Sequence, residues 1–265
     1  MNNSFLSYSQ HADDYIAWQL LGKKTTGMVV EIGAFDGKHL SNSYSLEQLG
    51  WQALCVEPNP SIFQFLEANR PHAVLVNKAI VGNETTKEIT FYSEEIGVLS
   101  GVVYDEEDIK RRYEKRGLAY KSPEKISVAA TTLNTLFNEN NITHVDILSI
   151  DVEGYEVEVL QGLDLTHISV GLFIIEANDA TFKSRILQFF EAYKNYVFIG
   201  SNFQNLFIMD KRMVMRKHLK TLDFADFIAA KQEHPISEKL AIDAVPPEFV
   251  KTDQFHKYVK PFKFF

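Results

Sequence analysis

An acidic residue and a glycine turn follow a short apolar run near the start of the chain. Residues 29–37 read VVEIGAFDG, so Glu31 and Asp36 flank Gly33. A glycine at the end of a buried strand lets a ligand approach the backbone, and carboxylates stabilise nearby cations. The segment therefore suits a nucleotide-like ligand with an ammonium group and a positive centre. S-Adenosylmethionine has both, as its amino group and its sulfonium.

The glycine spacing disfavours a dinucleotide. NAD-binding turns carry a Gly-x-Gly-x-x-Gly series, and Phe35 takes the place of the second glycine in a register that begins at Gly33. A NAD-dependent sugar oxidoreductase is therefore the weaker enzymatic alternative. The non-enzymatic alternative is a domain that binds the cofactor or a partner without turnover.

Two further strand ends suit adenosine. Glu57 follows the apolar residues 53–56, where a carboxylate can accept hydrogen bonds from vicinal ribose hydroxyls. Asn77 ends residues 74–77 and could contact adenine. The structural alternatives are a helix-start acid before Pro58 for Glu57 and a turn former for Asn77.

A third group of acids is the expected place of the chemistry. Residues 147–156 read ILSIDVEGYE, and a fourth strand beside the first would put Asp151, the candidate base, next to the transferable methyl group. Glu153 belongs to the same group of acids. Its structural alternative is an acid in the first turn of a helix, where it would stabilise the helix dipole. Glu176 and Asn178 share one side of the following strand end. With Asp151 they are candidate ligands for Mg²⁺ or Mn²⁺, which prefer oxygen.

His39 lies just beyond the glycine turn. Its neutral form is available near pH 7, so it could orient the acceptor or act as the base. The structural alternative is a hydrogen-bonded loop histidine.

Short apolar runs alternate with amphipathic stretches from residue 28 to 209, which predicts an α/β, doubly wound fold with a seven-stranded, mostly parallel sheet and helices on both faces. The predicted strands are residues 28–32, 53–56, 74–77, 145–150, 172–176, 196–199 and 206–209. The predicted helices are residues 43–49, a helix that begins at Pro60, and residues 132–137, 155–161 and 182–193. Residues 79–92 are predicted as a hairpin that turns at Gly82-Asn83. Residues 105–116 are predicted as a solvent-facing helix, with a substrate lid as the alternative.

Three parts of the chain are expected. Residues 1–27 form an N-terminal helical segment, residues 28–210 the cofactor-binding domain, and residues 211–265 an appendage with a short helix over 224–230. The appendage packs on the domain or on another subunit, which would make a homo-oligomer.

Composition limits the partners. The net charge of −8 gives no general attraction to nucleic acid or anionic membrane. The single cysteine, Cys55, fits a reducing compartment. No apolar run approaches the roughly 18 residues of a membrane span, and the N-terminus lacks the features of a signal peptide. We therefore expect a soluble, cytoplasmic protein without a nucleic acid partner and without a membrane span.

These motifs together resemble the FkbM-type family of S-adenosylmethionine-dependent methyltransferases, over roughly residues 7–209. The resemblance is carried by residues 30–37, 41–42, 56–60, 77–79 and 149–160. It implies a Rossmann-like class I methyltransferase fold and O-methylation of a hydroxyl on a sugar, glycan or secondary metabolite. The implied cofactor-binding residues are Gln10, Glu31, Gly33, Ala34, Asp36, Gly37, Ser41, Asn42, Glu57, Pro58, Asn77, Lys78, Ala79 and Asp151.

Overall fold

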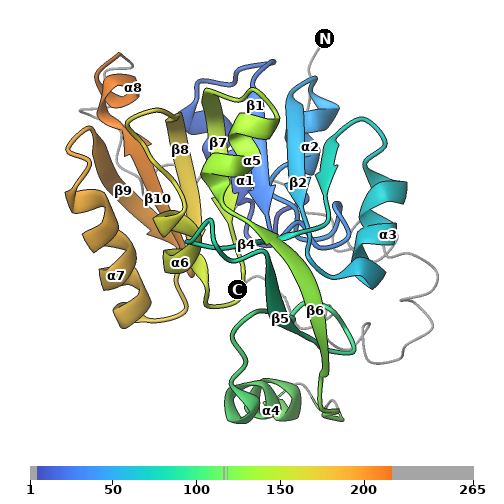
Figure 1. Cartoon of the computed structure of the whole chain (residues 1–265). Helices are drawn as coiled ribbons and strands as arrows, with labels where there is room; N and C mark the ends of the chain where they lie inside the picture. The colour runs from blue at the N-terminus through green and yellow to red at the C-terminus, as the bar shows by residue number, and fades with distance from the viewer. Residues whose placement is uncertain (1–4, 116, 118, 217–265) are drawn as a thin grey trace.

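The central sheet has seven strands in the order β3-β2-β1-β7-β8-β10-β9 (Figure 1). The structure is a computed structural model that describes residues 5–115, 117 and 119–216. β10 runs antiparallel to β8 and β9, and the other pairings are parallel. The predicted seven-stranded, mostly parallel sheet is therefore confirmed. Its strands are β1 (Met28–Ile32), β2 (Gln52–Val56), β3 (Val74–Val76), β7 (His144–Ile150), β8 (Ser169–Glu176), β9 (Tyr196–Asn202) and β10 (Asn205–Asp210).

Helices cover both faces of this sheet because successive strand residues point to opposite sides. Val29 packs in one core cluster with Ile16 and Leu66, whereas Val30 packs in another with Phe137 and Leu160. The first face carries α1 (Asp13–Leu20), α2 (Tyr44–Gln48) and α3 (Pro60–Asn69), and the second carries α5 (Leu133–Glu139), α6 (Glu156–Gln161) and α7 (Ala180–Glu191). Burial of both faces explains why the strands read as apolar runs.

Local signals fix several of the helix ends. Pro60 is the first residue of α3, and the side chain of Asn59 accepts a hydrogen bond from the Ser61 N–H at 3.1 Å. Thr132 caps α5 in the same way. Gly50, beyond α2, has a φ of 104°, which favours glycine. Pro60 is the residue from which the start of α3 was predicted.

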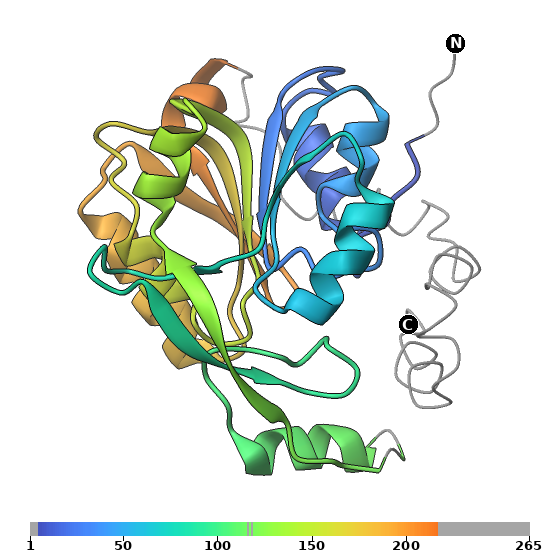
Figure 2. The same ribbon diagram turned by 45° about the vertical axis from the view of Figure 1, so that its right-hand side comes forward.

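A second sheet, β4-β6-β5, corrects the predicted hairpin. β4 (Ala79–Ile80) pairs in parallel with β6 (Glu124–Thr131), and β5 (Glu88–Ser93) pairs antiparallel with β6, so β4 and β5 are not partners. The hairpin was wrong because β6, which was not predicted, lies far along the chain from β4 and is mostly exposed or half-buried. Figures 1 and 2 show β5, β6 and α4 (Glu106–Lys115) projecting beyond one end of the main sheet. We call residues 79–131 the insertion.

The N-terminal segment contributes to the core, since Ile16, Ala17 and Trp18 of α1 pack with strand residues of the main sheet. After β10 the structure describes α8 (Lys211–Arg216). The predicted helix over 224–230 and the packing of residues 217–265 lie outside the described residues. Within the part of the chain that is described, every helix is too short or too polar to cross a membrane.

Candidate active site

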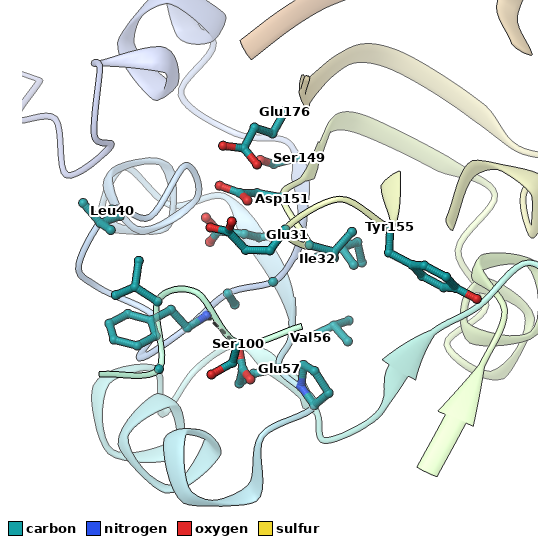
Figure 3. Close-up of a pocket in the computed structure, with 18 of the residues that line it drawn as sticks. Glu31, Ile32, Leu40, Val56, Glu57, Ser100, Ser149, Asp151, Tyr155 and Glu176 are labelled. Carbon is teal, nitrogen blue, oxygen red and sulfur yellow. Dashed lines mark hydrogen bonds between the residues drawn. The ribbon is translucent and has the colours of Figure 1, made fainter. Parts of the chain in front are cut away.

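A cavity opens at the carboxyl ends of β1, β2, β7 and β8, with the insertion as its opposite wall (Figure 3). Ligands of doubly wound sheets bind at this edge, where the chain crosses to the other side of the first strand. Most of the predicted site residues line the cavity: Gln10, Glu31, Gly33, Ala34, His39, Ser41, Asn42, Glu57, Pro58, Lys78, Ala79, Asp151, Glu153 and Glu176.

The structure corrects the expected position of Asp36, which is fully buried and does not line the cavity. Its carboxylate accepts hydrogen bonds from the backbone N–H groups of Lys38 and His39, at 2.9 and 2.8 Å. The His39 ring pairs with the same carboxylate through Nδ1 at 2.5 Å. Asp36 therefore shapes the turn and orients the buried ring of His39, a residue that borders the cavity.

Gly37, too, lies outside the cavity. Its φ is +79°, and a Cβ there would lie 2.7 Å from Cγ of Arg70, so the glycine serves close packing. Asn77 donates from Nδ2 to the carbonyl oxygens of Glu57 and Pro58, at 2.8 and 3.1 Å. Asn77 therefore ties the end of β3 to the residues after β2, and it does not line the cavity.

Asn178 is the fourth predicted residue outside the cavity wall. Its Nδ2 donates to Glu176 Oε2 at 3.2 Å, and its Oδ1 accepts from Gln204 Nε2 at 2.9 Å. The only oxygen of this side chain is therefore already paired with a neighbouring amide.

Glu31 organises the loop after the glycine turn. Its carboxylate accepts hydrogen bonds from the Asn42 N–H at 2.6 Å and from the hydroxyls of Ser41 and Ser43, at 2.7 and 2.5 Å. Burial raises the pKa of Glu31, while the Arg70 guanidinium, 4.0 Å away, opposes that rise. The acid predicted to bind a ligand directly is thus held mainly by protein donors.

Asn42 is the residue of this loop with a free acceptor. Its Nδ2 donates to Ser149 Oγ at 3.0 Å, and its buried Oδ1 has no hydrogen-bond partner. A buried acceptor without a donor costs about 1–3 kcal/mol. Because Asn42 lines the cavity, a ligand with an N–H or O–H group would satisfy it, which fits the amino group of S-adenosylmethionine.

Glu57 is fixed at the end of β2. Its Oε2 accepts the Phe35 N–H at 3.1 Å and its Oε1 accepts the Asn59 N–H at 2.8 Å. Burial raises the pKa of Glu57 to about 8. In the ionised form each oxygen keeps a further lone pair for a ligand hydroxyl, so the geometry of the carboxylate suits a vicinal diol.

Asp151, Glu153 and Glu176 form the acid cluster of the cavity, with one oxygen of each within 4.8 Å of the others. Burial raises the pKa of Asp151 to about 6 and that of Glu153 to about 8. Burial and the charge of Asp151 raise the pKa of Glu176 well above its usual value. Glu176 therefore takes up a proton more readily than a free carboxyl would, and a proton there can be shared with Asp151.

The same cluster offers the hard oxygen donors that Mg²⁺ and Mn²⁺ prefer. Glu153 stands where Asn178 was expected as the third ligand. A divalent ion thus fits the chemistry of the cluster.

Arg112 brings a positive charge from the insertion to this cluster. Its Nη1 lies 3.4 Å from Glu153 Oε2, and its Nε lies 2.8 Å from Asp108 of the same helix. Glu153 itself has a φ of 54°, a strained value that glycine tolerates better. Arg112 was not predicted as a site residue, because its spacing to Asp108 indicates an ordinary pair along a helix surface.

Other wall residues also went unpredicted. They come from the insertion and from the β9–β10 turn: Phe91, Gly97, Val98, Leu99, Ser100, Val102 and Gln204. None of them stands in a motif, and only the tertiary fold brings them to the cavity.

The sheet order and a cavity across the ends of β2, β1 and β7 define a Rossmann-like, doubly wound α/β fold. Residues 31–199 match the family described as methyltransferase FkbM domain. The chain belongs to this family, and the resemblance of its motifs is confirmed. It is a methyltransferase by family.

Solved structures give only distant similarity. A human methyltransferase 10 domain containing protein is 9% identical, with 76% of this chain and 80% of that chain covered and a TM-score of 0.38. A precorrin-6y C5,15-methyltransferase from Geobacter metallireducens is 11% identical, with coverage of 74% and 83% and a TM-score of 0.36. A protein of the NADB-Rossmann superfamily from Streptococcus agalactiae is 8% identical, with coverage of 94% and 96% and a TM-score of 0.38. No curated protein matches the chain significantly.

Proposed function

We propose that this chain is an S-adenosylmethionine-dependent O-methyltransferase that acts on a hydroxyl of a sugar, glycan or secondary metabolite. The observation that carries the proposal is one cavity that joins Glu57 at the end of β2 to Asp151 at the end of β7, with β1 between them. Figure 3 shows Glu57 toward one end of the cavity and Asp151 and Glu176 toward the other.

The cofactor half of the cavity has donors and acceptors that fit adenosine and an amino acid. Glu57 would accept hydrogen bonds from the ribose hydroxyls, and the orphaned Oδ1 of Asn42 would accept one from the amino group. Lys78 and Ala79 lie in the part of the cavity wall where the adenine ring is expected. When bound, S-adenosylmethionine supplies a methyl group made electrophilic by its sulfonium.

Asp151 is the proposed general base. A hydrogen bond between Glu176 and Asp151 lowers the Asp151 pKa from the value that burial alone would give. Asp151 with a pKa of about 6 is ionised at neutral pH and able to accept the proton of an acceptor hydroxyl. The half-buried position of the cluster in the cavity wall keeps the base oriented toward a bound acceptor.

A divalent ion is the alternative aid to the same step. Asp151, Glu153 and Glu176 would hold Mg²⁺ or Mn²⁺, and the ion would supply a Lewis acid that lowers the pKa of the acceptor hydroxyl. His39 is retained as a residue that orients the acceptor, because its ring is fixed by Asp36 and the residue borders the cavity.

The test is mass spectrometry of acceptor mixtures incubated with the protein and S-adenosylmethionine. We expect a gain of one methyl mass on a hydroxyl compound and release of S-adenosylhomocysteine. Methylation at nitrogen or carbon alone would overturn the O-methyltransferase assignment. Failure of the protein to bind the methyl donor would overturn the proposed cofactor.

A further inference from the structure

Glu94, a carboxylate of the insertion that is not one of the three acids of the cluster, is buried and holds a loop together. Its side chain is 4% exposed. It accepts hydrogen bonds from the backbone N–H groups of Ile96 and Leu99, both at 2.9 Å, and from the hydroxyl of Tyr113 in α4. A buried carboxylate is costly unless donors surround it, so these three bonds account for its stability.

The loop around Glu94 is closed at its base. Tyr92 and Gly101 exchange backbone hydrogen bonds at 2.8 and 3.1 Å, and the Glu94 N–H donates to Ser100 Oγ at 3.0 Å. Residues 97–100 of this loop line the cavity. Figure 3 shows Ser100 at the same end of the cavity as Glu57.

Packing links the loop to Glu57. A Cβ on Gly97 would lie 2.8 Å from Cδ1 of Ile62 and 3.0 Å from Cε2 of Phe35, so the loop backbone rests directly on both side chains. The N–H of Phe35 in turn donates to Glu57 Oε2. A shift of the loop would therefore reach the carboxylate proposed to bind ribose.

We propose that Glu94 is a positioning residue that fixes the loop of residues 94–101 against the Glu57 end of the cavity. It thereby sets the affinity for the nucleoside half of the methyl donor. The inference rests on the proposed function and adds a role for the insertion in cofactor binding.

The test compares E94Q with E95Q by calorimetric titration with S-adenosylhomocysteine and with adenosine. Glutamine replaces one acceptor oxygen of Glu94 by an amide that cannot accept a backbone N–H, whereas Glu95 is exposed and serves as the matched control. We expect E94Q to raise the dissociation constant about tenfold for both compounds, the factor that 1.4 kcal/mol represents. We expect E95Q to bind like the wild type.

The two compounds make the result specific to the nucleoside half. Equal affinity of E94Q and wild type for both, at a temperature where both are folded by circular dichroism, would overturn this inference alone. So would a loss seen with S-adenosylhomocysteine but not with adenosine. If E94Q does not fold, Y113F replaces it, since Y113F removes only the hydroxyl that donates to Glu94. A smaller loss of affinity is then expected for both compounds. No loss of affinity in Y113F would overturn the inference. Absence of binding by the wild type would overturn the proposed function as well.

Discussion

Gly33 and Asp151 meet at the tips of adjacent strands. A Cβ on Gly33, whose φ is +83°, would lie 1.8 Å from the carbonyl oxygen of Asp151. The Asp151 N–H donates to the Ile32 carbonyl at 3.0 Å, so β1 and β7 remain paired up to this point. The glycine therefore permits the close strand contact that places the candidate base beside the cofactor turn.

Replacement of Gly33 tests this contact. G33A should abolish donor binding and destabilise the fold, because the strand tips must move apart. The control is G117A. Gly117 also has a positive φ, +66°, but a Cβ there would meet no atom within 4 Å. G117A should therefore lower the free energy of unfolding by only roughly 1–2 kcal/mol, the cost of an alanine in the left-handed conformation. Urea unfolding of both variants measures the difference, and equal losses would contradict the contact.

Asp151 should be essential for turnover but not for binding. D151N removes the proton acceptor while it keeps the side-chain shape, so we expect a loss of about 100- to 10,000-fold in kcat. Donor affinity by calorimetry should stay close to that of the wild type. D179N, at the exposed N-cap of α7 where asparagine also caps well, is the control. An active D151N enzyme would remove Asp151 from the role of base.

Arg70 should contribute to stability from behind the cofactor site. This fully buried guanidinium pairs with Glu47 and Glu31 and donates to Ser43 Oγ at 2.9 Å. R70M leaves the carboxylates uncompensated, and removal of one partner from a buried pair costs about 3–5 kcal/mol. Denaturant unfolding measures the loss, with the exposed R111M as control. A loss no larger than that of R111M would contradict this role.

Burial of Glu57 should make stability depend on pH. Its pKa is about 8 in the folded chain, against about 4.3 when unfolded, so the folded state holds a proton that the unfolded state releases. The protonated Glu57 carboxyl therefore makes its full contribution to the free energy of unfolding below the unfolded pKa. That contribution is lost as the pH rises through about 8. Between pH 5 and 9 the ligand-free wild type should therefore lose more stability than E57Q.

Other acids whose pKa is raised by burial, such as Glu31 and Asp151, change stability in the same direction, so the difference between the variants is the informative quantity. E67Q, at an exposed position of α3, should follow the wild type. Parallel curves for E57Q and wild type in thermal unfolding across this range would contradict the raised pKa of Glu57.

Removal of divalent ions with a chelator tests whether the acid cluster acts through its own carboxyl groups or through a bound metal ion. Arg112 and the hydrogen bond between Glu176 and Asp151 already compensate part of the crowded charge. We therefore expect turnover to persist after exhaustive dialysis against EDTA. Loss of turnover that Mn²⁺ restores would instead assign the cluster to a divalent ion.

The main sheet and much of the site were predictable because their signals are local. Glu57 and Asp151 directly follow apolar runs, and parallel strands bring such residues to one edge. The role of Asp36 was not predictable in this way: nothing in its spacing distinguishes an acid that faces a ligand from one that binds the backbone of its own turn.

The insertion was harder to predict because its contacts join distant parts of the chain. β6 pairs with both β4 and β5, and each partner lies tens of residues before it along the chain. Arg112 and Glu94 acquire their roles only when α4 and the loop fold against the cavity. Buried Arg70 gave no signal either, since arginine is mostly found at protein surfaces.

The most direct test of the central claim is calorimetric titration of the wild type, E57A and D151N with S-adenosylhomocysteine. The account predicts one binding site in the wild type, similar affinity in D151N, and a loss in E57A, because Glu57 binds the ribose and Asp151 acts on the acceptor. No heat of binding with the wild type, or undiminished affinity in E57A, would contradict it.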